Sequence, residues 1–598
     1  MSRVFAACLA AVFSVCILCA QSPVGANLQK GFAAITEDHL RQDLSYIAGD
    51  KLEGRMSLQP GDETAVKWIA DQFAKAGLTP AASDAQGQPS FMQAVPLVEY
   101  RPDRGQSFLK MSRAGKDTEW KAPAVTGGFR HEVNLTAPVV FAGYGITAPE
   151  LGYDDYKGLD ANRKIVLVFD HEPQEDDAAS IFNGKGNTRY ATTRVKLLNA
   201  QKHGAVAMLV VAEPNRKHPT NAERMARIVG SITRTTPLPL QSIRDDELQI
   251  PALVVVDDVA DELLATEAAA RAKTGREEAS ALQAAIDAEL TPQGRSLPDT
   301  TATIHLANTS ERNGTSWNVA GLLKGSDANL SGETILITAH HDHDGAAPCP
   351  APDPAKPEAG NDLQASPVAV DEHGAAIAPG PNCVMIWHGA DDNGSGTVGV
   401  VELARAFATN PERPRRSILF VVFASEERGL LGAYYMAQHP LRPLATTRAQ
   451  INFDMIGRDE KPSRQTDGLI DIPADTSNRL NLIGAPYSPD YDAVVKQENA
   501  HVGLVLDDRF DHDSVLNVFF RSDQFPFVLH DIPALWWFTG FHPDYHHVSD
   551  TVEKIDFTKM KKILELAYLS AFRFSTDAPT PKFVANPMPA SAHGSGGE

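Results

Sequence analysis

The sequence predicts an α/β protein built on a mostly parallel mixed sheet, with helices covering both faces. Beyond residue 335, short apolar segments rich in β-branched residues alternate with segments of helical character, which is typical of a helix-covered parallel sheet. The first of these segments, Ile335 to Thr338, is continuously apolar, as expected of a strand buried on both faces. At 598 residues the chain exceeds one ordinary core, so at least two domains are expected.

The N-terminus is typical of a secretory signal. Arg3 precedes an apolar run from Val4 to Ala20, which is short for a membrane span and is followed by a polar chain. Small residues continue to Ala26, so residues 1–26 are predicted to be a signal peptide and the mature protein to be periplasmic or extracellular. Lipoprotein anchoring through Cys16 or Cys19 is an alternative, although the residues before each match that pattern poorly.

The net charge argues against certain partners, and the cysteine content predicts a disulfide. A net charge of -21 argues against nucleic acid or anionic membranes as partners, since both attract Lys and Arg patches. Outside the leader only Cys349 and Cys383 remain, flanking a Pro/Ala-rich insertion at residues 346–388. In an oxidising compartment we expect a disulfide that closes this insertion.

The chain before residue 301 is predicted to hold two regions. Residues 27–130 carry a short helix at 37–48 and an amphipathic helix with Asp62 as its N-cap, and are assigned to the main domain. Residues 131–300 combine strands with a helix at 190–203 and a long Ala/Glu helix, which indicates an inserted, smaller β-rich α/β domain. We expect no cluster of titratable residues at ligand spacing in this insert.

Residues 301–577 are predicted to complete the main domain. The segments 301–307 and 316–325 are candidates for paired strands. Further strands are predicted at 417–424, 450–454 and 534–538 and near Asn481, with helices at 397–408, 429–438 and 558–575 and near Asp492. Residues 578–598 are rich in Pro, Gly and Ser and are predicted to be disordered.

Five stretches place titratable side chains where a predicted strand ends or a helix begins. They are His340–Asp344, Asp391–Asp392, Glu426–Glu427, Asp454 and Asp544–His547. Any one of them could be a helix cap, a first-turn acid or a satisfied buried acid. Because ligands gather at the carboxyl ends of strands in open α/β sheets, all five together predict one site.

The residue types at this site favour zinc. Histidines combined with carboxylates suit Zn²⁺, whereas an all-oxygen set would suit Mg²⁺ or Ca²⁺. Two histidines and three carboxylates are too many for one open catalytic site. They fit two zinc ions that share a bridging carboxylate.

At these residues the sequence resembles the co-catalytic zinc peptidases of metallopeptidase family twenty-eight, which include secreted aminopeptidases, glutamate carboxypeptidase and glutaminyl cyclases. The A-H-x-D-H motif falls on residues 339–343, G-A-D-D-N-x-S-G on 389–396, and the E-E, D-M-x-G and Y-H motifs begin at Glu426, Asp454 and Tyr545. The resemblance implies a zinc exopeptidase fold. The insert at 131–300 resembles the protease-associated domain.

The resemblance also implies a role for each residue of the site. The implied metal ligands are His340, Asp392 as the bridge, Glu427, Asp454 and His546. The implied catalytic residues are Glu426 as general base, Tyr545 as oxyanion donor and Asp342, which orients His340. The neighbours His341, His343 and Asp344 are expected to be bystanders. Residues 522–527 resemble a family segment, but no chemistry is assigned to them.

The implied activity is that of a secreted aminopeptidase that hydrolyses N-terminal residues from peptides by a metal-bound water. A carboxypeptidase, with Arg458 or Arg521 binding the substrate carboxylate, and a cyclase are alternatives on the same fold. A non-catalytic metal- or peptide-binding protein is an alternative of another class. Peptides or proteins are the expected partners, with two Zn²⁺ ions as cofactors, and a monomer is slightly favoured.

Overall fold

The computed structural model describes residues 22–220, 223, 237–266, 274–349, 383–577 and 579–585. Most of the predicted signal peptide, residues 350–382 of the predicted insertion and most of the predicted C-terminal tail lie outside the described residues. Within the described part, no helix combines the length and the apolar character that a membrane span requires.

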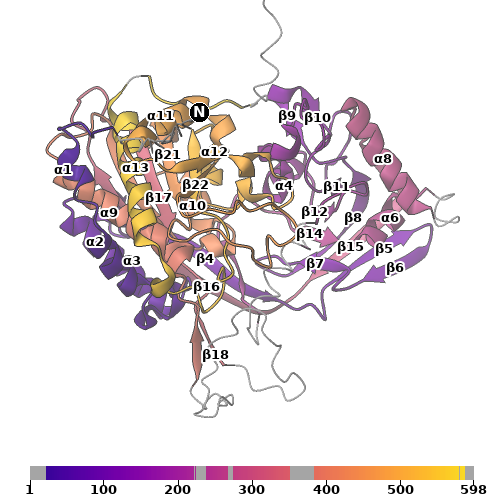
Figure 1. Cartoon of the computed structure of the whole chain (residues 1–598). Helices are drawn as coiled ribbons and strands as arrows, with labels where there is room; N and C mark the ends of the chain where they lie inside the picture. The colour runs from indigo at the N-terminus through magenta and orange to yellow at the C-terminus, as the bar shows by residue number, and fades with distance from the viewer. Residues whose placement is uncertain are drawn as a thin grey trace, which may run out of the picture.

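The larger of the two main sheets is mixed, with a parallel centre (Figure 1). The four strands β20, β17, β21 and β24 run parallel to one another, and antiparallel strands flank them. In spatial order the sheet contains β13 (Leu240–Ile243), β4 (Met92–Pro102), β16 (Asn308–Leu323), β20 (Ser417–Phe423), β17 (Thr334–His340), β21 (Thr447–Phe453), β24 (Ala534–Phe538), β22 (Arg479–Ile483) and β23 (Val505–Asp507), and β1 (Thr79–Pro80) pairs with β16.

Helices cover both faces of this sheet. One face packs against α1 (Gln29–Phe32), α2 (Glu37–Ile47), α3 (Pro60–Lys75), α9 (Gly396–Thr409), α11 (Pro489–Glu498) and α13 (Phe557–Thr576). The other face packs against α10 (Leu431–Gln438) and α12 (Phe525–Val528). The central strands β17 and β20 are buried along their whole length, which explains their continuously apolar sequences.

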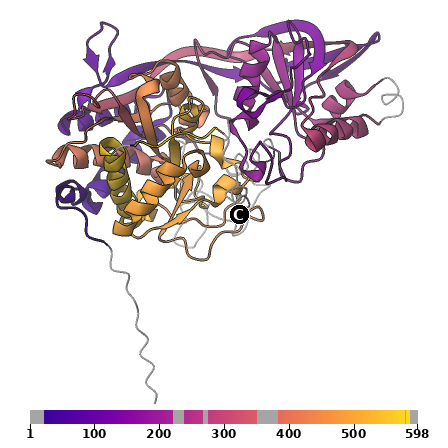
Figure 2. The same cartoon turned by 90° about the horizontal axis from the view of Figure 1, so that it is seen from above.

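A second sheet of eight strands forms a separate lobe, and long strands connect it to the first (Figure 2). In spatial order it contains β6 (Lys116–Trp120), β5 (Phe108–Arg113), β15 (Arg295–Leu306), β8 (Val133–Phe141), β11 (Ile165–Phe169), β12 (Ala207–Val211), β14 (Ala252–Val255) and β7 (Val125–Gly127). The helices α6 (Asp257–Leu264) and α8 (Gly275–Glu289) cover one face and α4 (Thr193–Lys202) the other. The domain boundaries at residues 131 and 300 stay predictions.

Two local expectations are wrong. The segments 301–307 and 316–325 do not pair with each other, because β15 pairs with β5 and β8, whereas β16 pairs with β4 and β20. Asp62 is not an N-cap, since α3 begins at Pro60. Its carboxylate instead accepts hydrogen bonds from the Leu58 N–H and the Ser316 hydroxyl, at 3.1 and 2.7 Å.

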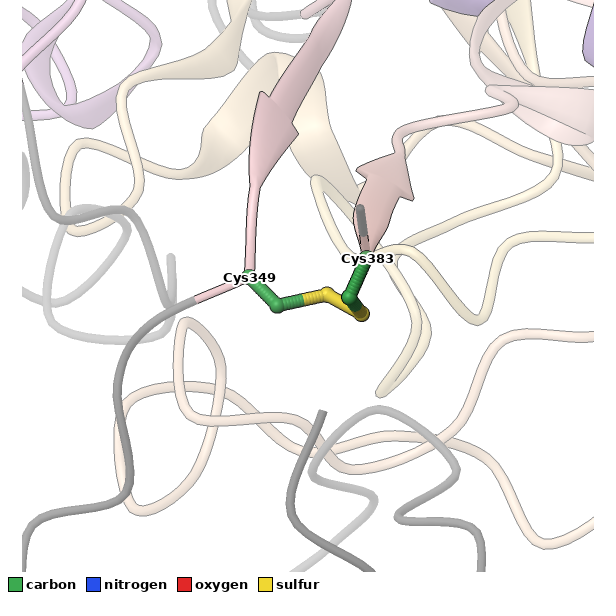
Figure 3. The surroundings of a disulfide bond; sticks show 2 residues. All are labelled: Cys349 and Cys383. Carbon is green, nitrogen blue, oxygen red and sulfur yellow. A yellow bond between two sulfur atoms is a disulfide. The ribbon is translucent and has the colours of Figure 1, made fainter. Parts of the chain in front are cut away.

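The expected disulfide between Cys349 and Cys383 is confirmed (Figure 3). It joins the ends of β18 (Ala346–Pro348) and β19 (Val384–Ile386), which pair antiparallel. The two described ends of the predicted insertion therefore form a covalently closed two-stranded stem.

Candidate metal centre

The side chains of the predicted site meet at the carboxyl edge of the parallel strands. His340 is the last residue of β17, Asp454 directly follows β21, and Glu426 and Glu427 lie just beyond β20. Asp392 reaches the same edge from the segment Ala390–Ser395 that precedes α9. Because neighbouring parallel strands end together, residues as far apart in the chain as His340 and Asp454 converge.

His340 lies at the centre of a first group of acids. Its Nε2 atom is 3.5 Å from Asp454 Oδ1, 3.6 Å from Asp392 Oδ1 and 3.7 Å from Glu426 Oε2. This nitrogen is buried and has no hydrogen-bond partner among the described residues. One ring nitrogen facing three carboxylate oxygens across such distances is an arrangement in which a cation can bind between them.

His546 forms a second group that shares one acid with the first. Its Nε2 atom lies 3.3 Å from Asp392 Oδ2 and 3.3 Å from Glu427 Oε2. Asp392 therefore presents one oxygen to each histidine. The structure thus brings together all five residues predicted as metal ligands, with Asp392 in the middle.

The side chains around the candidate ligands hold them in place. Asp342 accepts hydrogen bonds from the backbone N–H groups of Glu426 and Glu427, at 2.9 and 3.4 Å, and its Oδ1 lies 3.7 Å from His340 Nδ1. The hydroxyl of Ser522 donates to Asp454 Oδ2 at 2.6 Å. The segment 522–527, to which no chemistry was assigned, thus orients one of the acids.

The expectation that His343 and Asp344 are bystanders is wrong. His343 Nδ1 lies 2.6 Å from Glu427 Oε1, and Asp344 Oδ2 lies 2.9 Å from His546 Nδ1. Partners of this kind fix the tautomer and the orientation of a ligand. His341 contacts none of the candidate ligand carboxylates in this way, since its Nε2 lies 3.0 Å from the carbonyl of Trp317 and its Nδ1 3.4 Å from Asp62 Oδ1.

Two further residues contact the segments that carry the ligands, and no sequence signal identified them. The Arg55 guanidinium is fully buried and donates to the carbonyls of His341 and Gly389, among others, which ties two of the loops together. Asp550 accepts the backbone N–H groups of Asp391 and Asp392, at 2.9 and 3.1 Å. Both contacts join residues more than 150 positions apart, a proximity that local patterns do not reveal.

The buried acids repel one another. Burial, together with the charges of Asp454 and Glu427, raises the pKa of Glu426 well above its usual range. Burial and the charges of Asp344 and Asp342 raise the pKa of Glu427 to about 7, against the lowering effect of His546. Burial and the Glu427 charge also raise the pKa of Asp392. Burial alone would lower the pKa of His340, but the carboxylates of Glu426 and Asp454 raise it well above its usual range.

This charge pattern fits divalent cations. Three groups of donor atoms lie at this edge, made by His340, His343 and His546 together with Asp344, Asp392, Glu426, Glu427 and Asp454. Ionised carboxylates packed in such a place need a compensating charge. The mixture of imidazole and carboxylate donors suits Zn²⁺ better than Mg²⁺ or Ca²⁺.

Tyr545 and Arg521 lie beside the acids. The Tyr545 ring packs edge-on against His546, with centroids 4.2 Å apart, and Arg521 Nη2 donates to its hydroxyl at 3.4 Å. Burial and the charges of Asp392 and Glu427 raise the pKa of Tyr545 to about 12, against the lowering effects of His546 and Arg521. The phenol therefore keeps its proton at neutral pH and can donate a hydrogen bond.

The expectation that the second lobe holds no titratable cluster at ligand spacing is wrong. His171, Glu213 and His218 each offer a donor atom within 4.8 Å of the others. The sequence signal that could have revealed them is a titratable residue just after an apolar strand, as at the first site. His171 and Glu213 lie just beyond the ends of β11 and β12.

Residues 318–570 match the family model described as peptidase family M28. A probable zinc metalloprotease of Pyrenophora teres f. teres (strain 0-1) is 36% identical over 112 residues, which are 17% of this chain and 24% of the relative. Leucine aminopeptidase 2 of Trichophyton rubrum is 23% identical over 265 residues, 41% of this chain and 42% of the relative. The chain thus spans less than half the length of these curated relatives.

Among solved structures, the aminopeptidase from Aneurinibacillus sp. strain AM-1 is 18% identical, with a TM-score of 0.45. That alignment covers 94% of this chain and 98% of the other.

Proposed function

We propose that this protein is an exported zinc-dependent aminopeptidase that hydrolyses N-terminal residues from peptides. The match of residues 318–570 to peptidase family M28 is in keeping with this proposal. The observation that supports the proposal is the convergence of two histidines and four acids at one sheet edge. Within it, Asp392 faces both histidines, and Glu426 lies beside one of them.

In this proposal two zinc ions share the site. His340 and Asp454 would hold one ion and Glu427 and His546 the other, and Asp392, which presents one oxygen to each histidine, would serve both. When bound, zinc polarises a substrate carbonyl and makes water more acidic. The donors His340 and His546 are kept in orientation by Asp342 and Asp344.

Glu426 acts as the general base. It accepts a proton from the attacking water and returns that proton to the leaving amine. Its backbone is fixed by the hydrogen bond from its N–H group to Asp342. Tyr545 donates its phenolic hydrogen to the oxygen on which negative charge develops.

Amino- rather than carboxypeptidase activity is supported by the state of Arg458, one of the two candidate arginines. Arg458 is buried, donates to Asp544 at 2.8 Å and lies 3.8 Å from Asp550, so its charge is already matched within the protein. Arg521 donates to Tyr545. We assign no substrate carboxylate to either residue.

The test is a Glu426→Gln variant assayed on unblocked and N-acetylated peptides. We expect zinc content to be unchanged and the rate on unblocked peptides to fall by about 10²- to 10⁴-fold. Glu412→Gln, at an exposed glutamate, is the control and should keep the parental rate. A Glu426→Gln protein that hydrolyses at the parental rate would exclude Glu426 as the base.

The parental protein tests the rest of the proposal. Only unblocked peptides should be cleaved, and a chelator should abolish that cleavage until Zn²⁺ is added back. Equal cleavage of blocked and unblocked peptides would rule out the aminopeptidase, and activity that is indifferent to the chelator would rule out the metal.

A further inference from the structure

The second lobe repeats the arrangement of the first site on a smaller scale. Its strands β11 and β12 are parallel neighbours, and Phe169 of one pairs with Val211 of the other. His171 and Glu213 each lie two residues beyond this pair, so they occupy equivalent positions at the carboxyl edge. Both are buried. In open α/β sheets this edge is where ligands bind.

Two histidines and two glutamates meet at this edge. His171 Nδ1 lies 2.7 Å from Glu213 Oε1, and His218 Nε2 lies 2.6 Å from Glu175 Oε2. The two imidazole rings are nearly perpendicular, with centroids 4.8 Å apart. Donor atoms of His171, Glu213 and His218 all fall within 4.8 Å of one another, as the donors of the first site do.

A pair of His–Glu hydrogen bonds is the simplest account of these residues, but it leaves two features unexplained. Glu213 is 2% exposed, yet its Oε2 atom has no hydrogen-bond partner among the described residues. A buried carboxylate oxygen without a donor carries a desolvation cost. His171 also has a φ of 48°, a left-handed backbone conformation that a non-glycine residue adopts at a cost.

One cation of the protein lies close to the cluster without donating a hydrogen bond to its carboxylates. The buried Lys196 ammonium donates to the backbone carbonyls of His171 and Tyr144, at 2.5 Å each, rather than to Glu213. A surface hollow of about 770 Å³, lined in part by His218 and Pro219, adjoins the cluster at His218. Its cationic rim is partly neutralised, since Arg276 pairs with Asp257 and Lys217 with Asp176.

We propose that His171, Glu213 and His218 bind a divalent transition-metal ion, Zn²⁺ by preference, with Glu175 adjacent. Two imidazoles and a carboxylate form a donor set that suits Zn²⁺ and neighbouring transition metals rather than Mg²⁺ or Ca²⁺. The ion takes the place of the proton shared by His171 and Glu213, and Glu213 Oε2 gains a partner. This site is separate from the proposed peptidase site and does not depend on its chemistry.

Such an ion would stabilise the contact between the two lobes. The segment that follows His171 reaches the larger lobe, where the Asn187 carbonyl accepts the Tyr487 hydroxyl at 2.9 Å and Asn187 Nδ2 donates to Asn517 at 3.1 Å. Arg189 pairs with Asp531 at 2.7 Å. Joining His171 to the segment after β12 therefore anchors one end of the chain that makes these contacts.

The experiment compares metal content per chain in the full-length protein loaded with Zn²⁺ and dialysed. The variants Glu213→Gln and His218→Asn should each bind one Zn²⁺ fewer than the parental protein. His203→Gln is the matched control, because this histidine lies in the same lobe and stacks on Tyr156 outside the cluster. It should keep the parental content. Equal zinc content in all four proteins would overturn the proposal.

A measurement on the parental protein covers the case in which the variants do not fold. Crystals grown with Zn²⁺ should show an anomalous difference peak between His171, Glu213 and His218 at the zinc absorption edge. Crystals grown with Mg²⁺ alone should show none there. A map with zinc peaks at the first site and none at this cluster would also overturn the proposal.

Discussion

The two clusters at strand ends differ in what lies behind their donors. In the larger lobe the outer ring nitrogens of two histidines contact acidic residues. His340 Nδ1 lies 3.2 Å from the backbone carbonyl of Asp342 and 3.7 Å from its carboxylate, and His546 Nδ1 lies 2.9 Å from Asp344 Oδ2. In the second lobe His171 Nδ1 is hydrogen-bonded to Glu213, which is itself a candidate ligand. Since partners of this kind preorganise a ligand, the first cluster is built to hold ions tightly. The second must open a hydrogen bond to accept one.

The two clusters also differ in how far their acidic charges are matched by nearby histidines. In the first cluster the acids lie close to one another, and their mutual repulsion helps to raise the pKa values of Glu426, Glu427 and Asp392. In the second cluster each glutamate has a histidine as partner. The unmatched acids of the first cluster need a bound cation to offset their charge. The His–Glu pairs of the second cluster can bind a cation but do not need one.

Removing His546 should produce the largest effect, because it deletes a proposed ligand of the first cluster. His546→Ala is expected to lose one Zn²⁺ per chain and to lower peptide hydrolysis by more than about 100-fold, the upper range for residues that only support a ligand. His343→Ala is the matched comparison, since its Nδ1 lies 2.6 Å from Glu427 Oε1, whereas His546 faces the other oxygen of that carboxylate. It should keep the metal stoichiometry. The opposite result, with zinc lost in His343→Ala and kept in His546→Ala, would exchange the two assignments.

Removing the negative charge of Asp344, which contacts His546, should weaken zinc binding at the first cluster. Asp344 contacts both His546, at 2.9 Å, and Arg428, at 3.0 Å. Asp344→Asn keeps the shape and removes the charge, so zinc affinity should fall by about 10- to 100-fold. Competition with a chromophoric chelator measures this change. Asp327→Asn is the control, because Asp327 pairs with Arg415 just before β20, at the other end of that strand from the acids. An unchanged affinity would show that preorganisation does not distinguish the two clusters.

Much of the first site could be predicted from the sequence because its ligands occupy chain positions with a local signature, the end of an apolar strand or the start of a helix. Glu426 after β20 and Asp454 after β21 are examples. The supporting residues have no such signature. Asp550 and Arg55 bond to backbone groups far away in the chain, and only the packed fold brings them there.

For the fold, too, some features could be predicted from the sequence and others could not. Strands that are buried on both faces, such as β17 and β20, could be predicted because burial alone makes their sequences apolar. Strand pairing could not, since β15 and β16 follow each other directly yet lie in different sheets. The cluster at His171 was missed for another reason. Its histidines come from a strand end and a loop separated by more than 40 residues, without the run of titratable residues that marks His340–Asp344.

Asp155 in the second lobe allows the effect of burial on an acid to be separated from the effect of neighbouring charges. It accepts hydrogen bonds from the N–H groups of Tyr144 and Ile146, at 3.0 Å each, and from the Tyr153 hydroxyl at 2.6 Å. Burial nevertheless raises its pKa to about 7, although these hydrogen bonds and Lys196 oppose the rise. The folded protein therefore holds this proton more tightly than the unfolded chain does. The resulting stability is complete below pH 3.8 and is lost as the pH rises through about 7.

Asp155→Asn removes that titration while its amide oxygen keeps both N–H partners. Each pH unit over which only the folded state holds the proton is worth about 1.4 kcal/mol. Between pH 5 and pH 8 the free energy of unfolding should therefore change in favour of the variant, relative to the parental protein, by up to about 3 kcal/mol. Urea unfolding at the two pH values measures the difference, with the exposed Asp258→Asn as control. Parallel pH dependences in Asp155→Asn and the parental protein would mean that the three donors fully compensate burial, so that only the mutual repulsion of the first cluster makes its acids depend on a cation.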